Sequence, residues 1–505
     1  MISIRYFAIL MISVIILSGK NSTAQNTTFK LSDYKNPDYH YQALDLKFDL
    51  NNFLSTNKTI GNIDDYRNSS GLTSNAGANY SSNANSPGYQ RATNVSFGAG
   101  FGSSDYLDNL TISNIFKQER KTSSFNHYED LSVGALNRFY NAKQNYFEIN
   151  GSFSTAYDGN SETNRLNNND TITSFTSSKK YSSNNHASVA LLIGIGRIEQ
   201  VQDAQLAIYI LEDLRRLNRD KRAVSDDDVM ALAHQITSLK YKRFFDNRLR
   251  NIAAITAIDS FMQIKGIAGA ADAAYYTSLN DNWNYAHNPV RNSGRRIFTG
   301  IEADYIYNQT NDKQENKRTN IDISEITDQM QGGSIFLVAG ISSEKPVSLK
   351  WQRSANLKAG FGSGYQHTTN KYLLPETTAY KTNSFSGIFP SMKLSGDYGF
   401  GYYPNSRTWI TASWLLSAYY GKEMLGTSRN DKENYQNSLN AYTGPLIYAN
   451  YYLSEKFRMT CSFGGVFNLL HSKNTSNNAL PAPDNKSTTT FWSQSLSAAL
   501  TYSLF

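Results

Sequence analysis

Cysteine, long apolar runs and clustered positive charge are all scarce in this chain of 505 residues. Because Cys461 is its one cysteine, the chain cannot form an intramolecular disulfide. Beyond the N-terminal region no apolar run approaches the roughly 20 residues of a membrane-spanning helix, and mean hydropathy is -0.50. The formal charge of +7 is spread along the chain without a polybasic cluster, which argues against a nucleic-acid-binding protein.

Tyrosine and phenylalanine are abundant instead, with 34 and 26 copies, and many stand in segments that alternate between apolar and polar residues. In FWSQSLSAALTYSLF, residues 491–505, large apolar side chains share one side of an extended strand and small polar ones share the other. Such strands suit a closed barrel with lipid outside and water inside. The segment resembles the C-terminal strand of bacterial outer-membrane barrels, which implies an assembly signal at Tyr502, Leu504 and Phe505, read by the barrel assembly machinery.

About fourteen alternating segments can be identified, and an even number is typical of single-chain bacterial barrels. The sequence predicts strands at 41–54, 93–103, 106–117, 128–140, 146–157, 185–195, 295–308, 331–342, 347–362, 386–402, 408–420, 441–453, 457–470 and 491–505. It predicts external loops at 55–92, 118–127, 158–184, 309–330, 363–385, 421–440 and 471–490, with tight periplasmic turns at 141–145, 404–406 and 454–456. The expected fold class is therefore an all-β membrane protein, an antiparallel transmembrane β-barrel of about 14 strands.

The first residues predict the compartment. Arg5 gives a positive start, residues 6–17 are uncharged and mostly apolar, and Ser22-Thr23-Ala24 matches a signal-peptidase site. The apolar run is too short to span a bilayer. We therefore expect residues 1–24 to be a cleaved signal peptide and the protein to be exported to the bacterial outer membrane. No cysteine lies near the cleavage site, which excludes a lipid-anchored lipoprotein.

The pattern changes between residues 196 and 294, where charged residues are denser and apolar residues take helical spacing. Ser225, followed by three aspartates, predicts a helix N-cap. Three amphipathic helices are predicted from apolar stripes at Ala204, Ala207, Ile208, Leu211 and Leu214, at Val229, Leu232, Ala233, Ile236 and Leu239, and at Leu249, Ile252, Ile255, Ile258 and Met262. The expected domains are the first part of the barrel at 25–195 with about six strands, an α-helical periplasmic or plug insertion at 196–294, and the second part of the barrel at 295–505 with about eight strands.

A resemblance enters at this insertion. The phrases GIGRIEQVQDAQLAIYILEDL, KRFFDNRLRNI and YYTSLNDNWNYAHNPVRNSGRR resemble a group of Bacteroidota outer-membrane barrel proteins that carry a helical segment in mid-chain. The resemblance covers roughly residues 190–296. It implies a location and an architecture, and it implies no particular activity.

Along each predicted strand, alternate residues share a face, and one face is mostly polar. The charged side chains on this polar face are the candidates for lining a lumen. They are Asp45, Lys47, Asp49, Glu302, Asp304, Lys350, Lys358, Lys393, Asp397 and Arg458. Both signs occur, so strong ion selectivity does not follow. Arg353 falls on the apolar face of its predicted strand, where an arginine in the middle of the membrane lowers stability by about 2–4 kcal/mol. Either a β-bulge shifts the alternation there or the strand begins later.

The helical insertion supplies a second set of candidates: Arg197, Glu199, Arg243, Asp246, Arg248 and Arg250. Arg197 and Glu199 can form a plain ion pair or a latch that holds the helices under the pore. The other four can pair at helical spacing or form a cationic surface. Gly194-Ile195-Gly196 lacks the third glycine of a dinucleotide loop, and glycine's backbone freedom at a tight exit from the barrel explains it better.

No catalytic, cofactor or metal site is predicted, because the seven histidines are scattered and no nucleophile motif flanks them. We expect a non-enzymatic outer-membrane barrel, with a porin-like or gated channel for polar solutes as the leading function. The alternative is a scaffold or surface-binding protein that recruits partners through its loops or helices. The expected partners are outer-membrane lipid, the barrel assembly machinery and, for the scaffold, periplasmic or outer-membrane proteins. Nucleic acid is not expected.

Overall fold

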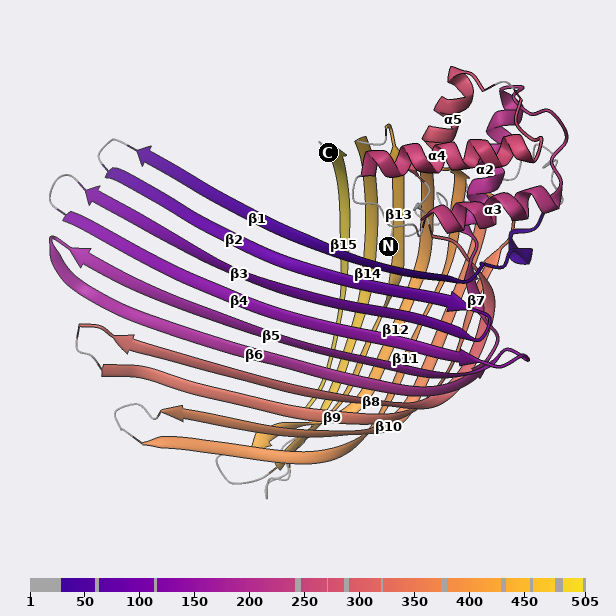
Figure 1. The fold of residues 1–505 in the computed structure, drawn as a ribbon. Helices are drawn as coiled ribbons and strands as arrows, with labels where there is room; N and C mark the ends of the chain where they lie inside the picture. The colour runs from indigo at the N-terminus through magenta and orange to yellow at the C-terminus, as the bar shows by residue number, and fades with distance from the viewer. Residues whose placement is uncertain are drawn as a thin grey trace, which may run out of the picture. The chain divides into compact units, whose positions relative to one another are not determined.

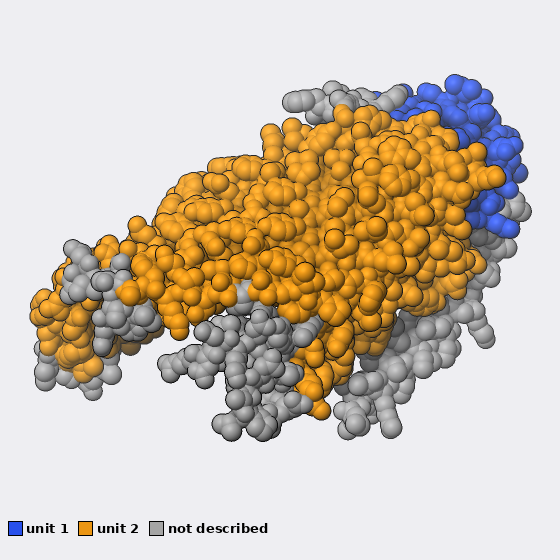
Figure 2. Space-filling model, turned by 90° about the horizontal axis from the view of Figure 1, so that it is seen from below, with its two compact units in different colours: residues 1–35, 201–290 blue, residues 36–200, 291–505 orange. Residues whose placement is uncertain are grey.

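The computed structural model describes residues 29–502, apart from 60–62, 113–115, 241–246, 270, 286–289, 319–320, 374–378, 428–432, 455–456 and 477–484. It divides into two compact units, which Figure 2 distinguishes by colour. The helical unit comprises Met1–Lys35 and Val201–Val290, and the sheet unit comprises Asn36–Gln200 and Arg291–Phe505. The predicted signal peptide, residues 1–24, lies outside the described residues.

The sheet unit is one antiparallel sheet whose long strands lie side by side in chain order (Figure 1). Within the described residues fourteen strands form its path, and the short β7 pairs with β8 beside that path. The strands are β1 (Tyr39–Thr59), β2 (Ile63–Ser86), β3 (Tyr89–Ile112), β4 (Phe116–Tyr140), β5 (Asn145–Asn168), β6 (Thr171–Ile195), β7 (Ile198–Gln200), β8 (Asn292–Asn316), β9 (Ile321–Pro346), β10 (Trp351–Leu373), β11 (Tyr380–Asn405), β12 (Thr408–Thr427), β13 (Glu433–Tyr452), β14 (Phe457–Ser476) and β15 (Asn485–Tyr502).

The number of long strands matches the expected fourteen, but two predicted assignments behind that number are wrong. The predicted loop at 55–92 contains the whole of β2, and the predicted strands at 93–103 and 106–117 both start within the single strand β3. One strand was therefore missed and another was counted twice. The predicted external loop at 118–127 is also wrong, because it lies wholly within β4. The remaining predicted external loops are shorter than expected, because the flanking strands continue into them.

Register gives the sheet an apolar face and a polar face. Ile301, Leu337, Phe361, Met392 and Tyr420 stand opposite one another on five successive strands and define the apolar face. These are large side chains that remain open to the surroundings, with Leu337 64% and Phe361 59% exposed. A continuous surface of this kind needs an apolar environment to cover it, since monomeric soluble proteins rarely expose so large a patch.

Aromatic pairs mark one border of the apolar face. Tyr89 with Phe139, Trp351 with Tyr402, and Phe457 with Tyr502 have ring centroids 5.2, 4.7 and 6.4 Å apart. All lie at the end of the sheet from which the chain leaves β6 for the helices, which we call the insertion end. A second set of aromatic residues lies about ten residues farther along the strands than these pairs. At about 3.3 Å per residue and a strand tilt of about 40°, the distance between the two sets is roughly 25 Å. Its members are Tyr157, Tyr305, Phe361, Tyr420 and Trp492. The spacing equals the height of the apolar band of an outer-membrane barrel.

Beyond this band the strands continue toward the opposite end of the sheet, the far end, with polar residues on both faces. In β6 the stretch from Thr171 to Asn185 is rich in serine, threonine, lysine and asparagine, and only Val189 to Ile195 alternates with large apolar residues. Alternation is expected only where the two faces of a strand meet different environments. This is the physical reason why the sequence indicated loops where the structure has strands.

The sheet does not close into a barrel within the described residues. Across the described residues β1 pairs only with β2, and β15 pairs only with β14, so both outer edges remain open. The predicted closed barrel is corrected to an open sheet in this structure. Open strand edges carry unpaired backbone groups, which are available for pairing with another strand.

Four α-helices form the helical unit, one more than predicted: α2 (Gln202–Arg216), α3 (Asp226–Lys240), α4 (Asn247–Ile264) and α5 (Ala273–Asn284). The missed helix α5 is capped by Asp272, whose carboxylate accepts from the Tyr275 N–H at 3.1 Å, and it buries Tyr275, Leu279 and Trp283. Spacing of four residues between these side chains was a signal that could have found it. Among the described residues, none of the helices is long and apolar enough to span a membrane.

The predicted stripes of α2 and α3 are buried, and these two helices pack against each other. On α4 the buried face runs through Ala254, Ile258 and Met262, so including Ile252, which is 56% exposed, was wrong. The Ser225 cap is confirmed: its hydroxyl accepts from the Asp228 N–H at 3.2 Å, while the Asp228 carboxylate accepts from the Ser225 N–H at 2.9 Å.

The N-terminal segment of the helical unit packs on α3, although the sequence assigned it to the barrel. The Tyr34 hydroxyl lies 2.8 Å from that of Thr237, and the Thr237 hydroxyl donates to Asp203 at 2.7 Å. Asp203 also pairs with Lys240 at 2.6 Å, and both side chains are 4% exposed. A buried ion pair of this kind needs its additional hydrogen bonds, and the threonine supplies one of them.

Candidate functional site

A charged cluster lies on the polar face where β8 to β11 run side by side. Glu302 on β8 receives bonds from Lys358 on β10 and from Lys393 on β11, the latter at 2.7 Å. Lys393 also lies 3.8 Å from Asp304. Asp397 accepts two bonds from the Asn356 amide, both at 3.2 Å. Half of the predicted lumen-lining residues therefore come together in one patch of two lysines and three carboxylates.

Glycine makes this cluster possible. Lys393 stands opposite Gly360 on β10, and a Cβ added to Gly360 would meet the Lys393 side chain at 3.0 Å. The lysine can therefore lie flat across β10 and β9 and reach a carboxylate on β8. On its way the ammonium lies 4.1 Å from the centre of the Phe336 ring, a cation–π contact.

The other predicted residues of the sheet lie outside this cluster. Asp45, Lys47 and Asp49 share the polar face on β1, where Lys47 pairs with Asp49 at 2.7 Å. Arg458 is the second residue of β14 and lies over the Tyr452 ring at 5.9 Å. Lys350 is corrected: β10 begins at Trp351, so Lys350 belongs to the preceding turn and not to the wall.

The later start of β10 also explains Arg353. No register shift interrupts the ladders of β10, so Arg353 does lie on the apolar face. It is two residues from Trp351, which belongs to the aromatic border, and it stands opposite Lys345. At the border an arginine side chain can reach water, so the cost expected for the middle of the band does not apply.

A short crossing segment, Gly196–Gln200, forms the second notable cluster. Arg197 pairs with Glu199 at 2.6 Å, and both side chains are nearly buried. The Arg197 guanidinium also donates to the carbonyls of Pro87 and Ser86, each at 2.8 Å, in the turn between β2 and β3. It lies 4.7 Å from the centre of the Tyr140 ring at the end of β4. We call this segment the strap.

The strap connects parts of the sheet that are far apart in strand order. Its residues Ile198–Gln200 pair with Asn292–Gly294 at the start of β8, the seventh strand of the path. Its other contacts reach back to the first strands: Gln90 on β3 donates to the Ile198 carbonyl at 3.2 Å, and Asn36, just before β1, donates to the Gln200 carbonyl at 3.0 Å. The strap therefore joins the seventh strand to the beginning of β3 and to the segment that leads into β1.

Backbone geometry agrees with this crossing. Gly196 has φ +90° and Gly294 has φ +129°, a region that side chains disfavour. A Cβ on Gly196 would lie 2.1 Å from the Arg295 carbonyl oxygen. The expectation that glycine permits a tight exit from the sheet is confirmed at Gly196.

The candidates within the helices are less well defined. Arg243 and Asp246 lie outside the described residues, as does the Arg248 side chain, so their predicted pairing is not tested. Arg250 donates to the Lys240 carbonyl at 2.9 Å. Of the predicted assembly signal, Tyr502 ends β15 opposite Phe457, while Leu504 and Phe505 lie outside the described residues.

Sequence reasoning missed a buried ionic cluster at the insertion end. Glu148 on β5 pairs with Arg138 on β4 at 2.5 Å and with Arg296 on β8 at 3.8 Å. Arg291, which is 1% exposed, donates to the carbonyls of Ser348 and Trp351 at 3.0 and 2.9 Å and fixes the turn before β10. Opposite charges at the ends of adjacent predicted strands were the available signal for Arg138 and Glu148.

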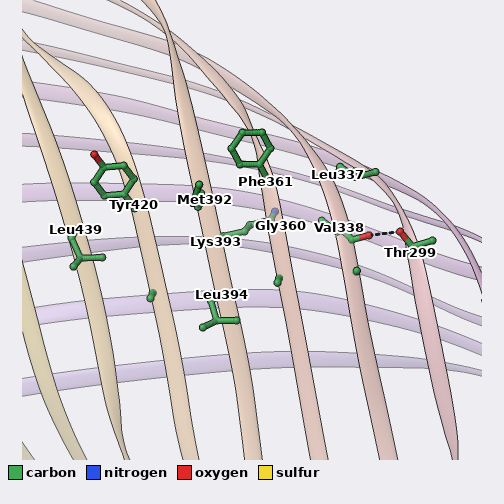
Figure 3. A pocket seen from close by; sticks show the side chains of 13 residues that line it. Thr299, Leu337, Val338, Gly360, Phe361, Met392, Lys393, Leu394, Tyr420 and Leu439 are labelled. Carbon is green, nitrogen blue, oxygen red and sulfur yellow. Dashed lines mark hydrogen bonds between the residues drawn. The ribbon is translucent and has the colours of Figure 1, made fainter.

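The apolar face also has a shallow hollow of about 470 Å³. Its lining includes the small side chains of Thr299, Ala339 and Ala359. The larger Phe361 and Met392 also line it (Figure 3). The Thr299 hydroxyl is bonded to the Val338 carbonyl at 2.9 Å, so it offers little to a polar ligand. Hydrocarbon suits this surface better than a polar solute does.

No metal-binding group of histidine, cysteine or carboxylate side chains occurs within the described part of the chain. In the helical unit, hydrogen bonding from the Arg222 guanidinium holds the pKa of Asp228 well below its usual range. Burial and the bond to Asp259 raise the pKa of Tyr275 far above its usual range. Both groups are structural, because their partners lie within the helical unit.

Comparisons with known proteins give a limited result. No protein-family model matches the chain, and no curated protein matches its sequence. Solved structures that it resembles include the translocator domain of the autotransporter NalP from Neisseria meningitidis, with 11% identity over 84% of this chain and 91% of that chain and a TM-score of 0.22. The ferric yersiniabactin uptake receptor FyuA from Yersinia pestis has 6% identity over 93% and 73%, with a TM-score of 0.30. The outer membrane protein opdK from Pseudomonas aeruginosa has 8% identity over 91% and 99%, with a TM-score of 0.16.

These neighbours are outer-membrane β-barrel proteins. Their TM-scores are too low to carry an argument about this chain.

Proposed function

We propose that the chain forms an outer-membrane β-barrel, a porin-like or gated channel for polar solutes whose helical unit lies at the periplasmic mouth. The apolar face contacts lipid, the polar face lines the lumen, and β1 closes the barrel by pairing with β15. Support comes from the band of about 25 Å between two aromatic borders, which is the height that a lipid-facing barrel wall needs. Polar strand extensions at the far end favour that end as the outer surface, because periplasmic turns are short.

Closure has a definite register. On the polar face, Tyr41 of β1 stands opposite a residue of β2, which stands opposite a residue of β3, and so on across the sheet. This row of opposed residues ends at Ser487 on β15. Pairing Phe48 with Leu496 aligns the apolar segments of both strands and brings Ser487 opposite Asn57. The row then returns to β1 about 16 residues from its start, which for fourteen strands gives a tilt of about 40°, within the range of natural barrels.

Disulfide cross-linking tests this register. In a Cys461→Ser background, Phe48→Cys combined with Leu496→Cys should form a disulfide upon mild oxidation, because directly opposed residues of an antiparallel pair have suitable geometry. Phe48→Cys combined with Gln494→Cys is the matched control and should cross-link poorly. Efficient cross-linking of the control alone would contradict the register, and failure of both in folded protein would contradict closure.

The strap supports the proposal that the channel is gated. In a closed barrel of fourteen strands the entrance to the first strand lies almost opposite the seventh strand, so a segment that contacts both Asn36 and β8 reaches over part of the mouth. The chain enters and leaves the helical unit at Lys35, Val201 and Val290, each adjoining the insertion end of the sheet unit. Obstruction of the lumen at this end is the simplest consequence.

Conductance of purified protein in planar bilayers tests the gate. Replacement of residues 201–290 by a short Gly/Ser connection should leave a folded barrel whose single-channel conductance is higher than that of the full chain. Arg197→Ala, which removes the bonds between the strap and the β2–β3 turn, should increase the frequency of opening. A folded shortened protein that conducts no better than the full chain would contradict the gate.

The scaffold alternative draws on one observation. In strands such as β2 and β6 the far half is mostly polar on both faces and extends beyond the apolar band, which gives a surface outside the membrane. Under this alternative the shortened protein would conduct no better and would lose proteins that co-purify with the full chain.

A further inference from the structure

The polar face contains a second hollow, of about 330 Å³, beside the charged cluster. Two adjacent rows of the polar face line it. One row contains Lys358, Ser395 and Tyr442, and the other contains Asn356, Asp397 and Leu415. The lining therefore combines charges, an amide, a hydroxyl and apolar surface within a volume typical of small-molecule sites.

Lys358 and Asp397 are the charged residues that line this hollow, and only the lysine has an opposite charge as its partner among the described residues. Lys358 is engaged by Glu302, and Lys393 is engaged by Glu302 and Asp304. Asp397 has the Asn356 amide as its donor and makes no ion pair among the described residues. A carboxylate that faces a hollow without a counter-ion attracts a cation, and the low-dielectric wall behind it strengthens that attraction.

An aromatic ring completes the environment. Tyr442 is 44% exposed although it projects from the polar face, and it lines the hollow together with Leu415 and Phe298. Aromatic faces attract ammonium groups, and the adjoining leucine offers contact to a short hydrocarbon body. Metal ions and fully polar solutes would gain nothing from this apolar part of the lining.

We propose that this hollow is a solute-binding site for a small organic ammonium ion. The ammonium group binds the Asp397 carboxylate, and Tyr442 and Leu415 cover the attached hydrocarbon. The inference rests on the proposed function, because it takes the polar face as the wall of a lumen, and it gives the permeating solute a chemical class.

The test uses n-butylammonium as the probe and the neutral n-butanol as its isostere, with the full-length protein in a planar bilayer. Butylammonium added at millimolar concentration should reduce the channel current, whereas butanol at the same concentration should not. Asp397→Asn should weaken this block at least tenfold, and Tyr442→Ala should weaken it severalfold.

Asp45→Asn is the matched control, since it makes the same change of charge on the same face, on β1 and far from the hollow in strand order. The block should survive it. Equal weakening by Asp45→Asn and Asp397→Asn would reveal general attraction of cations to the lumen and would overturn the site. Unchanged block in Asp397→Asn would overturn it as well.

A second measurement separates this inference from the proposed function. Calorimetric titration of butylammonium into detergent-solubilised protein reports binding whether or not the protein conducts. Binding that Asp397→Asn abolishes, in a protein that forms no channel, would support the site and contradict the channel. A conducting protein without butylammonium binding would retain the channel and overturn the site.

Discussion

Leu357 offers a quantitative test of the membrane assignment. It lies on the apolar face of β10, opposite Ile341 and Gly396, and is six residues from the border residue Trp351. At about 3.3 Å per residue and a tilt of about 40°, this places it roughly 15 Å into a band of about 25 Å. Arginine near the middle of such a band costs about 2–4 kcal/mol, so Leu357→Arg should lower the free energy of unfolding by about that amount.

Urea titration of the protein folded into lipid vesicles measures this change, with heat-modifiable gel mobility as the indicator of the folded state. Asn356→Arg is the control, because its side chain lies at the same depth on the polar face, where Asp397 is available as a partner. The native Arg353 lies only about 5 Å from the border by the same arithmetic, so Arg353→Leu should change stability by less than about 1 kcal/mol. Equal tolerance of arginine at positions 356 and 357 would refute the assignment of the two faces.

Three further predictions concern the helical unit and the orientation of the sheet. Lys240→Ala should destabilise the helical unit by about 3–5 kcal/mol, because it leaves the Asp203 carboxylate buried without its partner, and hydrogen exchange in α3 should rise accordingly. The pKa of Asp228 is lower in the folded state than in the unfolded chain, so its contribution to stability is present above the unfolded pKa of about 4 and is lost as pH falls. In thermal unfolding, Asp228→Asn should therefore lose less stability between pH 6 and pH 3 than the unchanged protein does. Cysteine placed at Asp170, in the turn between β5 and β6, should react with a membrane-impermeant maleimide on intact cells, while cysteine at Ser406 should not, and the reverse pattern would invert the proposed orientation.

Sequence patterns predicted the sheet where lipid would contact one side of it. Leu44, Leu46, Phe48 and Leu50 alternate with charged residues on β1, and the register places them all on the apolar face. Such alternation arises where one face of a strand meets an apolar environment and the other meets water. Strand β2, by contrast, is dominated by serine, asparagine, glycine and alanine, so its two faces hardly differ in hydropathy and the strand was predicted as a loop.

The charged cluster was predictable in part. Parity correctly placed Glu302, Lys358 and Lys393 on one face, because side chains alternate strictly along a strand. Which of them meet depends on the stagger between strands and on the glycine that lets Lys393 lie flat, and neither can be derived from the alternation of a single strand. The partners of Arg197 were still less accessible, since they lie about 110 residues away in the chain.

Helix prediction succeeded where an apolar stripe was continuous, as in α2 and α3. It failed for α5, where tyrosine and tryptophan take the place of aliphatic residues and asparagines surround them. It also misjudged α4, because Ile252 belongs to the apolar pattern of the sequence yet faces outward. Packing partners, and not apolar character alone, decide which side of such a helix is buried.

Cysteine accessibility during conduction tests the central claim most directly. Two neighbouring pairs of positions, Phe48 with Asp49 on β1 and Asp397 with Tyr398 on β11, place one member on each face of the sheet. In a Cys461→Ser background, a charged, water-soluble methanethiosulfonate should change the single-channel current of Asp49→Cys and Asp397→Cys and leave that of Phe48→Cys and Tyr398→Cys unchanged. Modification of the current through the apolar-face positions, or through all four alike, would contradict a lumen lined by the polar face.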